Sequence, residues 1–295
     1  MVGANMPAAE IEVTLDLVER LLADQRPALA GLPLEVMGNG WDNYSVLIGD
    51  SLVGRFPRRR ASAELIQNEA RWLPILGPSL PLPVPVPLFV GEPAPGYPWP
   101  WSIAKLLPGS PANEVEDLDY GICADQIGRF LGALHVTAPR DAPTNAYRGV
   151  PLLQRDTTFR ERLSELDPIL DVGLAVTIWE SALEARPFAD DPVWIHGDLQ
   201  PHNLLALGRR LSAVVDFGDV TSGDPATDLA VVWSLLVNDA RAHFWSAYGT
   251  HDEALLQRAR GWALNLGTAM LANSADNPAL FAVGRRTVDA VLAGD

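Results

Sequence analysis

The stretch that decides the fold of this chain is HGDLQPHN, residues 196–203, which DFGD follows at residues 216–219. Asp198 and Asn203 stand five positions apart and can share one tight loop. Asp216 stands 18 positions after Asp198, beyond two short apolar segments joined by Gly-Arg-Arg at 208–210, a pattern typical of a β-hairpin. Because a hairpin returns the chain to its starting point, we expect the two carboxylates and the amide to converge.

Two carboxylates and one amide oxygen at one place suit phosphoryl transfer. One carboxylate can orient or deprotonate an attacking hydroxyl, while the amide and the second carboxylate are hard oxygen ligands for Mg²⁺. The reaction needs little beyond in-line positioning and charge neutralisation. The alternative, with Asp198 as a helix cap and Asp216 in a turn, requires a coincidence, since H-G-D-x4-N alone arises by chance in about one chain in 500 of this length.

Composition indicates a globular protein without disulfides or nucleic-acid binding. Of the 295 residues 48% are apolar and 20% charged, and Cys123 is the single cysteine, which excludes a disulfide framework and a multi-cysteine metal site. The formal net charge is −15 and Lys105 is the single lysine, so a nucleic-acid partner is excluded. The acidic surplus falls mainly after residue 108, and it either attracts a cationic small molecule or only keeps the protein soluble.

No membrane or export signal is evident. The first 20 residues lack a basic segment followed by a long apolar one, and no apolar run approaches the ~20 residues that a membrane span needs. We expect a cytoplasmic protein that acts on a small molecule. The sequence indicates no oligomeric state.

The first third of the chain favours a small sheet with two helices. Helical spacing follows Thr14 and returns over 64–76, and short strands are expected at 34–37, 44–48, 51–56 and 101–107. Residues 78–111 hold many prolines between apolar residues. We interpret them as extended segments on a sheet edge, with a polyproline linker as the alternative.

The remainder favours helices around one hairpin. Helices are expected at 122–134, 159–170, 174–185, 228–237 and 255–271, with strands at 203–207 and 211–216. The fold class is therefore α+β, with a β-rich N-terminal domain over 1–106, a larger helical domain over 107–295, and a connection at about 101–108.

The two motifs resemble the aminoglycoside phosphotransferase family, relatives of the eukaryotic protein kinases with the same two-lobed fold. The family pattern D-F-G-D followed by G-D-P-x-x-D-L-A is matched in full by residues 216–230. GNGWDN at 38–43 and GRFPR at 54–58 look like the macrolide-kinase branch of this family.

The resemblance implies roles for residues in the helical part. Asp198 would be the catalytic base or hydroxyl-orienting acid, and Asn203 and Asp216 would bind Mg²⁺. Asp228 would be buried and would accept backbone hydrogen bonds near the catalytic loop. His196 would brace that loop, and His135 is expected to be structural at the end of its helix.

The resemblance also implies a nucleotide site in the N-terminal part. Arg55 stands where the family has a lysine or arginine on the α- and β-phosphates, and Glu69 would be its ion-pair partner. Arginine keeps the positive charge and can bind two phosphate oxygens at once. Since Asp198, Asn203 and Asp216 are all intact, we expect an active enzyme. The other members would be the loop over the triphosphate and the backbone that meets the purine: Gly38, Asn39 and Gly40, and Ile103, Lys105 and Leu107.

These implications point to Mg²⁺-dependent transfer of the γ-phosphoryl of ATP or GTP to a hydroxyl of an antibiotic, a resistance kinase. One alternative is a kinase of a primary metabolite such as choline, homoserine or a thio-sugar. A second is a nucleotide-binding module without turnover. The acceptor, possibly a cation by the overall charge, is not identified by any motif.

Overall fold

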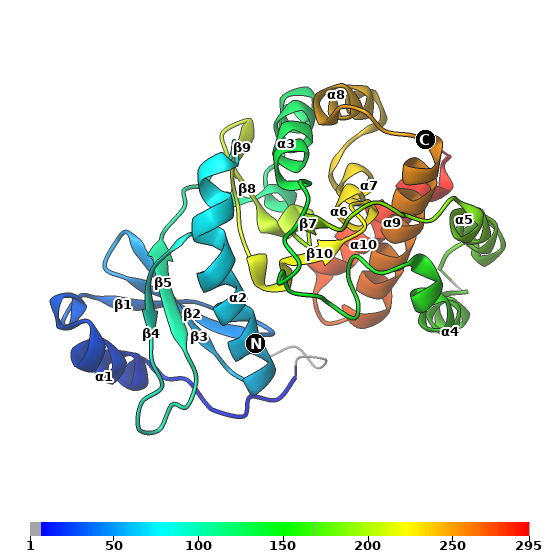
Figure 1. Cartoon of the computed structure of the whole chain (residues 1–295). Coiled ribbons are helices and arrows are strands. Elements are labelled where there is room, and N and C mark those ends of the chain that lie inside the picture. Colours follow the sequence, from blue (N-terminus) through cyan, green and yellow to red (C-terminus); the bar gives the residue numbers. More distant parts are fainter. Residues whose placement is uncertain (1–6, 168, 295) are drawn as a thin grey trace. The chain divides into compact units, whose positions relative to one another are not determined.

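The computed structural model describes residues 7–167 and 169–294 (Figure 1). The chain divides into two compact units, the first comprising the residues up to Pro78 together with 83–107, the second 79–82 and everything from Pro108 onward. The predicted domains met between 106 and 107, one residue earlier, and without the excursion at 79–82. The parts of the predicted segments at residues 1–6, 168 and 295 lie outside the described residues.

The first unit is a five-stranded antiparallel sheet in the order β1-β2-β3-β5-β4 with two long helices (Figure 1). All six elements predicted for this part are present, and β4, from the proline-rich segment, is a seventh. The bounds are β1 Leu34–Asn39, β2 Asn43–Ile48, β3 Leu52–Pro57, β4 Pro87–Gly91, β5 Trp101–Lys105, α1 Leu15–Gln25 and α2 Arg60–Leu76.

One face of this sheet forms an apolar core under α1. Alternate residues of β2 such as Val46 and Ile48 are fully buried, as the two-residue period of a strand requires. Phe56 stacks on Trp101 with ring centroids 5.1 Å apart, and α1 adds a stripe of leucines and a valine to the same cluster. Trp99 belongs to this cluster too, so both tryptophans near the connection serve packing.

The proline-rich segment is part of the sheet. β4 is its last strand and pairs only with β5, so Pro87, which has no N–H to donate, lies at the edge where a proline costs least. The interpretation as extended segments on a sheet edge is confirmed for this part, and the linker alternative was wrong for it.

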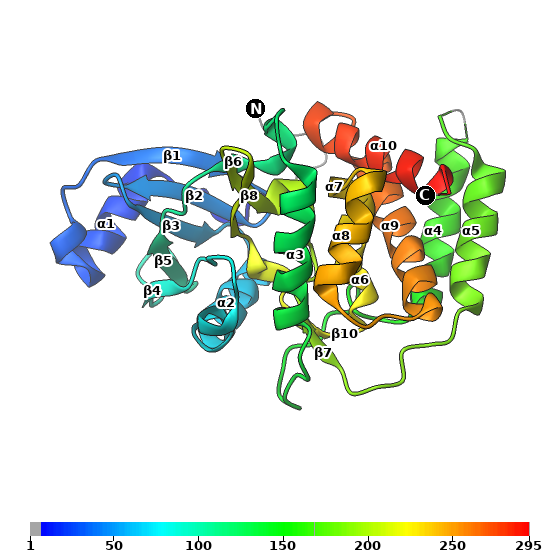
Figure 2. The same cartoon turned by 90° about the horizontal axis from the view of Figure 1, so that it is seen from above.

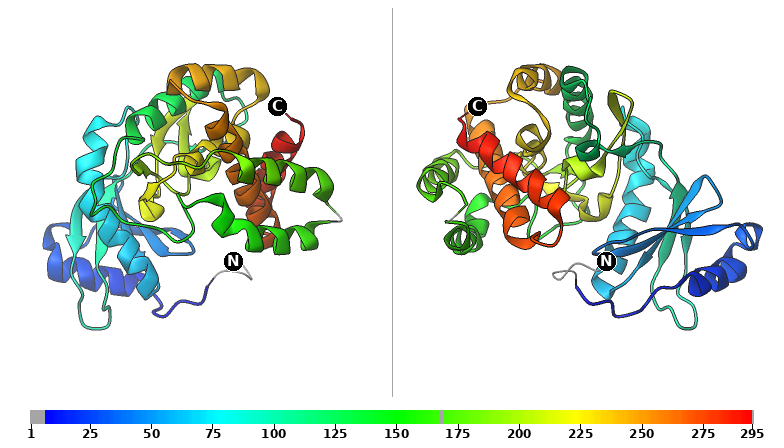
Figure 3. Two further views of the ribbon diagram at one scale, coloured as in Figure 1. Left: turned by 45° about the vertical axis from the view of Figure 1, so that its right-hand side comes forward. Right: turned by 180° about the vertical axis from the view of Figure 1, so that it is seen from behind.

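The second unit is mostly helical (Figure 2). α3 and α8 lie side by side, and α9 packs against α5 and α10. In Figure 3 α9 is orange, α10 is red and α5 is green. The bounds are α3 Tyr120–Leu134, α4 Asp156–Leu166, α5 Val172–Glu184, α6 Ala226–Leu229, α7 Val231–Leu235, α8 Asn238–Tyr248, α9 Glu253–Asn273 and α10 Pro278–Leu292. Among the described helices none combines the length and apolar character that a membrane crossing requires.

The predicted hairpin is present, but it is not the whole of the β-structure in this unit. β8 (Leu204–Leu207) pairs with β9 (Arg210–Val214), and β6 (Ser110–Pro111) joins β8. A second sheet pairs β7 (Val193–Ile195) with β10 (Thr221–Gly223). The expectation of one hairpin was therefore incomplete, because strands of two or three residues are too short to show alternation.

The helix pattern needs three corrections. The single helix expected over 228–237 is two short helices, since the chain tightens at Ala230, whose N–H returns to Thr227 O. The helix expected over 159–170 is α4, which begins at Asp156 and ends at Leu166. Finally, α8 and α10 were not expected, and the chain continues past the helix at 255–271.

Candidate active site

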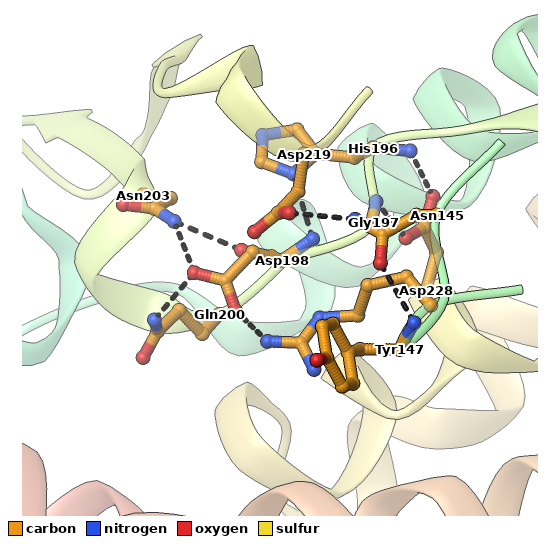
Figure 4. Close-up of polar contacts among 10 residues, drawn as sticks. Asn145, Tyr147, His196, Gly197, Asp198, Gln200, Asn203, Asp219 and Asp228 are labelled. Carbon is orange, nitrogen blue, oxygen red and sulfur yellow. Dashed lines mark hydrogen bonds and ion pairs between the residues drawn. The ribbon is translucent and has the colours of Figure 1, made fainter. Parts of the chain in front are cut away.

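Asp198 lies on the loop between β7 and β8 and is held from two sides (Figure 4). Gln200 Nε2 donates to Asp198 Oδ2 at 3.0 Å, and Asn203 Nδ2 donates to the Asp198 backbone oxygen at 2.8 Å and to Oδ2 at 3.3 Å. The side chain is still 27% exposed. A fixed, partly exposed carboxylate can accept a proton from a bound hydroxyl.

The hairpin brings Asp216 back to Asn203, as expected. The N–H of Val215, the residue before Asp216, donates to Asn203 O at 2.9 Å. His196 Nε2 donates to Val215 O at 3.0 Å, so the histidine connects the loop before the hairpin to the residue that follows β9. Asp216 has φ of 62°, the left-handed region, and it is the one such non-glycine residue in the described part of the chain. Backbone strain of this kind concentrates at functional sites.

The donor set at this place fits Mg²⁺. Both hydrogen bonds of the Asn203 side chain are made through Nδ2, and within 7–167 and 169–294 no group donates to its Oδ1. That oxygen and the exposed carboxylate of Asp216 are hard ligands. The described residues form no cluster of three or more His, Cys, Asp or Glu side chains for a metal. Two protein ligands are usual for Mg²⁺, which takes its other ligands from phosphates and water.

Asp228 is the buried support of this loop, as predicted. Its side chain is fully buried. Oδ2 accepts the N–H of His196 at 2.7 Å, and Oδ1 accepts the N–H of Gly197 at 2.9 Å. Gly197 has φ of +87°, and a Cβ there would lie 2.4 Å from the backbone oxygen of Asp219. The turn before Asp198 therefore requires glycine.

His135 ends α3 and joins the same network. Its Nε2 lies 3.3 Å from Asp228 Oδ2, and its Nδ1 lies 3.0 Å from the Tyr248 hydroxyl. The side chain is 4% exposed, which confirms the structural interpretation. Tyr248, from α8, was not expected, because it stands 113 residues away in the sequence.

Three further side chains around Asp198 were not anticipated. Arg148 Nη2 lies 3.4 Å from Asp198 Oδ1. Asn145 Nδ2 donates to Asp219 Oδ1 at 2.8 Å, and burial raises the pKa of the Asp219 carboxyl. Asn145 and Arg148 come from the irregular segment after α3, which carries no motif. Gln200, by contrast, stands inside the quoted motif.

In the first unit the predicted ion pair is present. Arg55 Nη1 donates to Glu69 Oε1 at 2.6 Å and Oε2 at 2.5 Å, and the glutamate side chain is only 2% exposed. Arg55 follows Gly54, which faces the core, so the pleat turns the arginine toward the opposite face of the sheet. The contact of Arg55 with a nucleotide stays a prediction.

The predicted phosphate loop joins β1 and β2. The Gly40 N–H donates to Asn43 O at 3.0 Å, and the buried Arg58 donates to Gly40 O at 2.8 Å. A Cβ at Gly38 would meet no atom within 4 Å, so the backbone there is uncrowded. Asn39 and Gly40 are exposed.

The predicted purine-binding segment divides in two. Ile103 is buried, with Gly54 of β3 on one side and Phe89 of β4 on the other, so its backbone belongs to the sheet. Lys105 is exposed and pairs with Leu52 alone, and Leu107 is the last residue of the unit. Lys105 is thus the last residue of its strand and Leu107 lies beyond it, and the contact of all three with a purine stays a prediction.

A β-rich unit followed by a helical unit, with an aspartate–asparagine loop and a second aspartate across a hairpin, defines a kinase-like phosphotransferase fold. Solved structures carry the same fold. The chain aligns with aminoglycoside 2'-phosphotransferase-IIIa in its GDP complex at a TM-score of 0.72 and 20% identity, over 96% of this chain and 99% of that one. It aligns with a macrolide 2'-phosphotransferase from Brachybacterium faecium at 0.60 and 22%, over 94% and 97%.

The chain belongs to the phosphotransferase enzyme family, whose sequence profile matches residues 33–262. It is 26% identical to an aminoglycoside 3'-phosphotransferase of Escherichia coli over 134 residues, which is 43% of this chain and 49% of that protein. An aminoglycoside 3'-phosphotransferase of Salmonella typhimurium is 29% identical over 136 residues, 44% of this chain and 50% of the relative. The chain thus spans about half the length of the curated relatives it matches.

Proposed function

We propose that this protein transfers the γ-phosphoryl group of ATP or GTP, with Mg²⁺, to a hydroxyl of a small molecule. The observation that carries the proposal is the fixation of Asp198: two amide side chains hold it, yet 27% of its side chain stays exposed. Family membership supports the reaction class, and the GDP and ATP complexes of structures with this fold support a nucleotide.

In this proposal Asp198 receives the acceptor hydroxyl. Its Oδ2 is occupied by donors from Gln200 and Asn203, which fix the plane of the carboxylate. A positioned carboxylate that accepts the hydroxyl proton contributes about 10²- to 10⁴-fold to such a reaction. Without a histidine or cysteine assigned as phosphoryl carrier, transfer is direct, in a ternary complex.

Asn203 Oδ1 and Asp216 would hold the metal, which neutralises the charge of the transferring phosphoryl group when bound. The hydrogen bond from Val215 to Asn203 fixes the spacing of these two ligands along the backbone. In the first unit Arg55, oriented by Glu69, would contact the α- and β-phosphates, and the loop 38–43 would cover the triphosphate.

The first acceptors to test are antibiotics. Relatives and structures of this fold are named as aminoglycoside and macrolide phosphotransferases, and one structure holds kanamycin and another gentamicin. Because the chain covers about half of its curated relatives, the acceptor is carried over only as a class to test, beside choline, homoserine and thio-sugars.

The test is a nucleotide-coupled phosphorylation assay with ATP or GTP and Mg²⁺ against these acceptors. Asp198→Asn, which keeps the shape and removes the base, is expected to lower kcat at least about 100-fold while nucleotide still binds. Asp125→Asn, on the exposed side of α3, is the matched control and is expected to match the wild type.

Activity of Asp198→Asn above a few per cent of wild type would overturn the role of Asp198. Nucleotide binding without phosphorylation of any acceptor would favour the non-catalytic binding module. Chelation of Mg²⁺ by EDTA is expected to abolish turnover, and addition of excess Mg²⁺ to restore it.

A further inference from the structure

Three arginines of the second unit gather beside the candidate active site: Arg148, Arg155 and Arg162. Arg155 ends the 3₁₀ helix Leu152–Arg155, and Arg162 lies seven residues later on α4. The Arg155 guanidinium lies 5.2 Å from the ring centre of Tyr147, the neighbour of Arg148.

The three arginines of this cluster outnumber the carboxylates that contact them. In the described part of the chain Asp198 is the one carboxylate within 4.0 Å of any of the three, at 3.4 Å from Arg148. Arg162 is held instead by neutral groups of α9, since its Nη1 donates to Asn265 O at 2.8 Å and to Thr268 Oγ1 at 3.0 Å.

Two donors of the cluster are unused. Nε of Arg148 and Nε of Arg155 are buried and make no hydrogen bond with any described group. A buried donor without an acceptor is costly, and a guanidinium presents its donors as a fork that matches a carboxylate or a phosphate.

The charges also act on one another. Burial lowers the pKa of Arg155, and the charge of Arg148 lowers it further. Burial likewise lowers the pKa of Arg162 to about 10, and the charges of Arg155 and Arg148 act in the same direction, against the charge of Glu165, which raises it. A bound anion would offset the repulsion among these charges and would accept hydrogen bonds from the unused donors.

We propose that the arginine cluster binds an oxyanion, a carboxylate or phosphate group carried by the acceptor itself. The inference rests on the proposed function, in which Asp198 receives the acceptor hydroxyl. Because Arg148 contacts Asp198, an acid held by the cluster would lie within the length of a small molecule from that carboxylate. A polycation would be repelled there, so the acceptor is a hydroxylated acid.

The first experiment measures anion binding without turnover. Thermal unfolding is followed in inorganic phosphate and in chloride at equal ionic strength, for the wild type, Arg155→Gln and Arg160→Gln. Arg160 is the matched control, since it lies on α4, is exposed and is paired with Asp156. Phosphate is expected to raise the melting temperature of the wild type and of Arg160→Gln, and to raise that of Arg155→Gln by less than half as much.

The proposal would be overturned if phosphate raised the melting temperature of all three proteins equally, or did not raise that of the wild type. If Arg155→Gln does not fold, Arg155→Lys replaces it, because lysine keeps the charge and loses the fork. An intermediate phosphate effect in that variant supports the proposal, and a full effect overturns it.

The second experiment identifies the source of the anion. Acceptors that share a pyranose ring and differ in one group, glucuronate, glucose and glucosamine, are assayed beside homoserine and choline. Acids are expected to be phosphorylated, with KM about 10- to 100-fold higher in Arg155→Gln and kcat within about threefold. Inorganic phosphate is expected to compete with the acceptor.

The outcomes separate the two proposals. Turnover of neutral or cationic acceptors with unchanged KM in Arg155→Gln would overturn the acidic acceptor and leave the proposed function standing. Phosphate that binds at the arginine cluster without competing would mean a separate anion and would also overturn it. If no acceptor is phosphorylated, the proposed function fails, and the unfolding experiment alone decides whether the arginine cluster binds oxyanions.

Discussion

Oδ1 of Asp228 accepts the backbone N–H of Gly197 at 2.9 Å, and this contact fixes the turn from which Asp198 projects. The other oxygen of Asp228 accepts the N–H of His196 and lies near the His135 ring. A fully buried carboxylate with donors on both oxygens replaces its hydration almost completely. The position of the loop that carries Asp198 therefore depends on a buried residue 30 positions further along the chain.

Asp228→Asn is expected to destabilise the protein and to slow catalysis. An amide can accept at one oxygen only, so its NH₂ would face the N–H of either Gly197 or His196. We expect a loss of about 2–4 kcal/mol in the free energy of unfolding, measured with urea, and a lower kcat. Asp289→Asn, whose aspartate is half exposed on α10, is expected to change little. Equal stability of Asp228→Asn and wild type would contradict this role.

Gly197→Ala is expected to cost more than Gly208→Ala. Both glycines have positive φ, +87° and +63°, so both variants carry the strain of an L-residue in the left-handed region, roughly 1–2 kcal/mol. At Gly197 the new Cβ would also lie 2.4 Å from Asp219 O, whereas at Gly208 no atom lies within 4 Å. Urea unfolding of both variants measures the difference, and equal losses would show that the turn can shift.

Glu69→Gln is expected to weaken nucleotide binding about tenfold without changing the KM of the acceptor. The amide keeps the size but removes the charge that orients Arg55. Titration of ATP by calorimetry measures the effect, and Glu64→Gln, exposed on the same helix, is the control. Arg55→Lys is expected to retain more affinity than Arg55→Gln, since the charge is kept. Unchanged ATP affinity in Glu69→Gln would show that this ion pair does not contribute to nucleotide binding.

Asp219→Asn is expected to stabilise the protein at neutral pH. Burial raises the pKa of Asp219 above the value of the unfolded chain, near 3.8, so the folded state holds this proton more tightly. The ionised carboxylate therefore costs stability above its raised pKa, and the cost disappears as the pH falls below the unfolded value. The advantage of Asp219→Asn should thus be present at pH 7 and absent below about pH 4. Urea unfolding across this range measures it, and an advantage that is independent of pH would contradict the raised pKa.

Much of the fold and of the loop around Asp198 could be predicted because the interactions are local. The strand and helix periods in the first unit follow from which face each residue buries, and Thr14 caps α1 as its position suggests. Asp198, Asn203 and Asp216 are joined by a single hairpin, so spacing along the chain already limits their separation. The ion pair of Arg55 with Glu69 was implied by the resemblance, and its two residues stand 14 positions apart on consecutive elements.

The irregular contacts could not be predicted. Arg148 stands 50 residues from Asp198, Asn145 stands 74 from Asp219, and Tyr248 stands 113 from His135. Such contacts depend on how helices pack, and the segments that carry the first two have no periodicity. The strands β7 and β10 pair across 26 residues and show no alternation of their own.

The net charge of this protein can be read from its sequence, but the charges around Asp198 depend on the fold. The composition determined the acidic net charge and the absence of nucleic-acid character, and the motifs determined the chemistry of the loop at 196–203. The composition left open whether the acceptor is a cation. In the tertiary structure Arg148 lies 3.4 Å from Asp198. The Arg155 guanidinium lies over the ring of Tyr147, the neighbour of Arg148. Net charge is a sum over the whole surface, whereas a bound ligand responds to the charges within a few ångströms, and folding alone decides which these are.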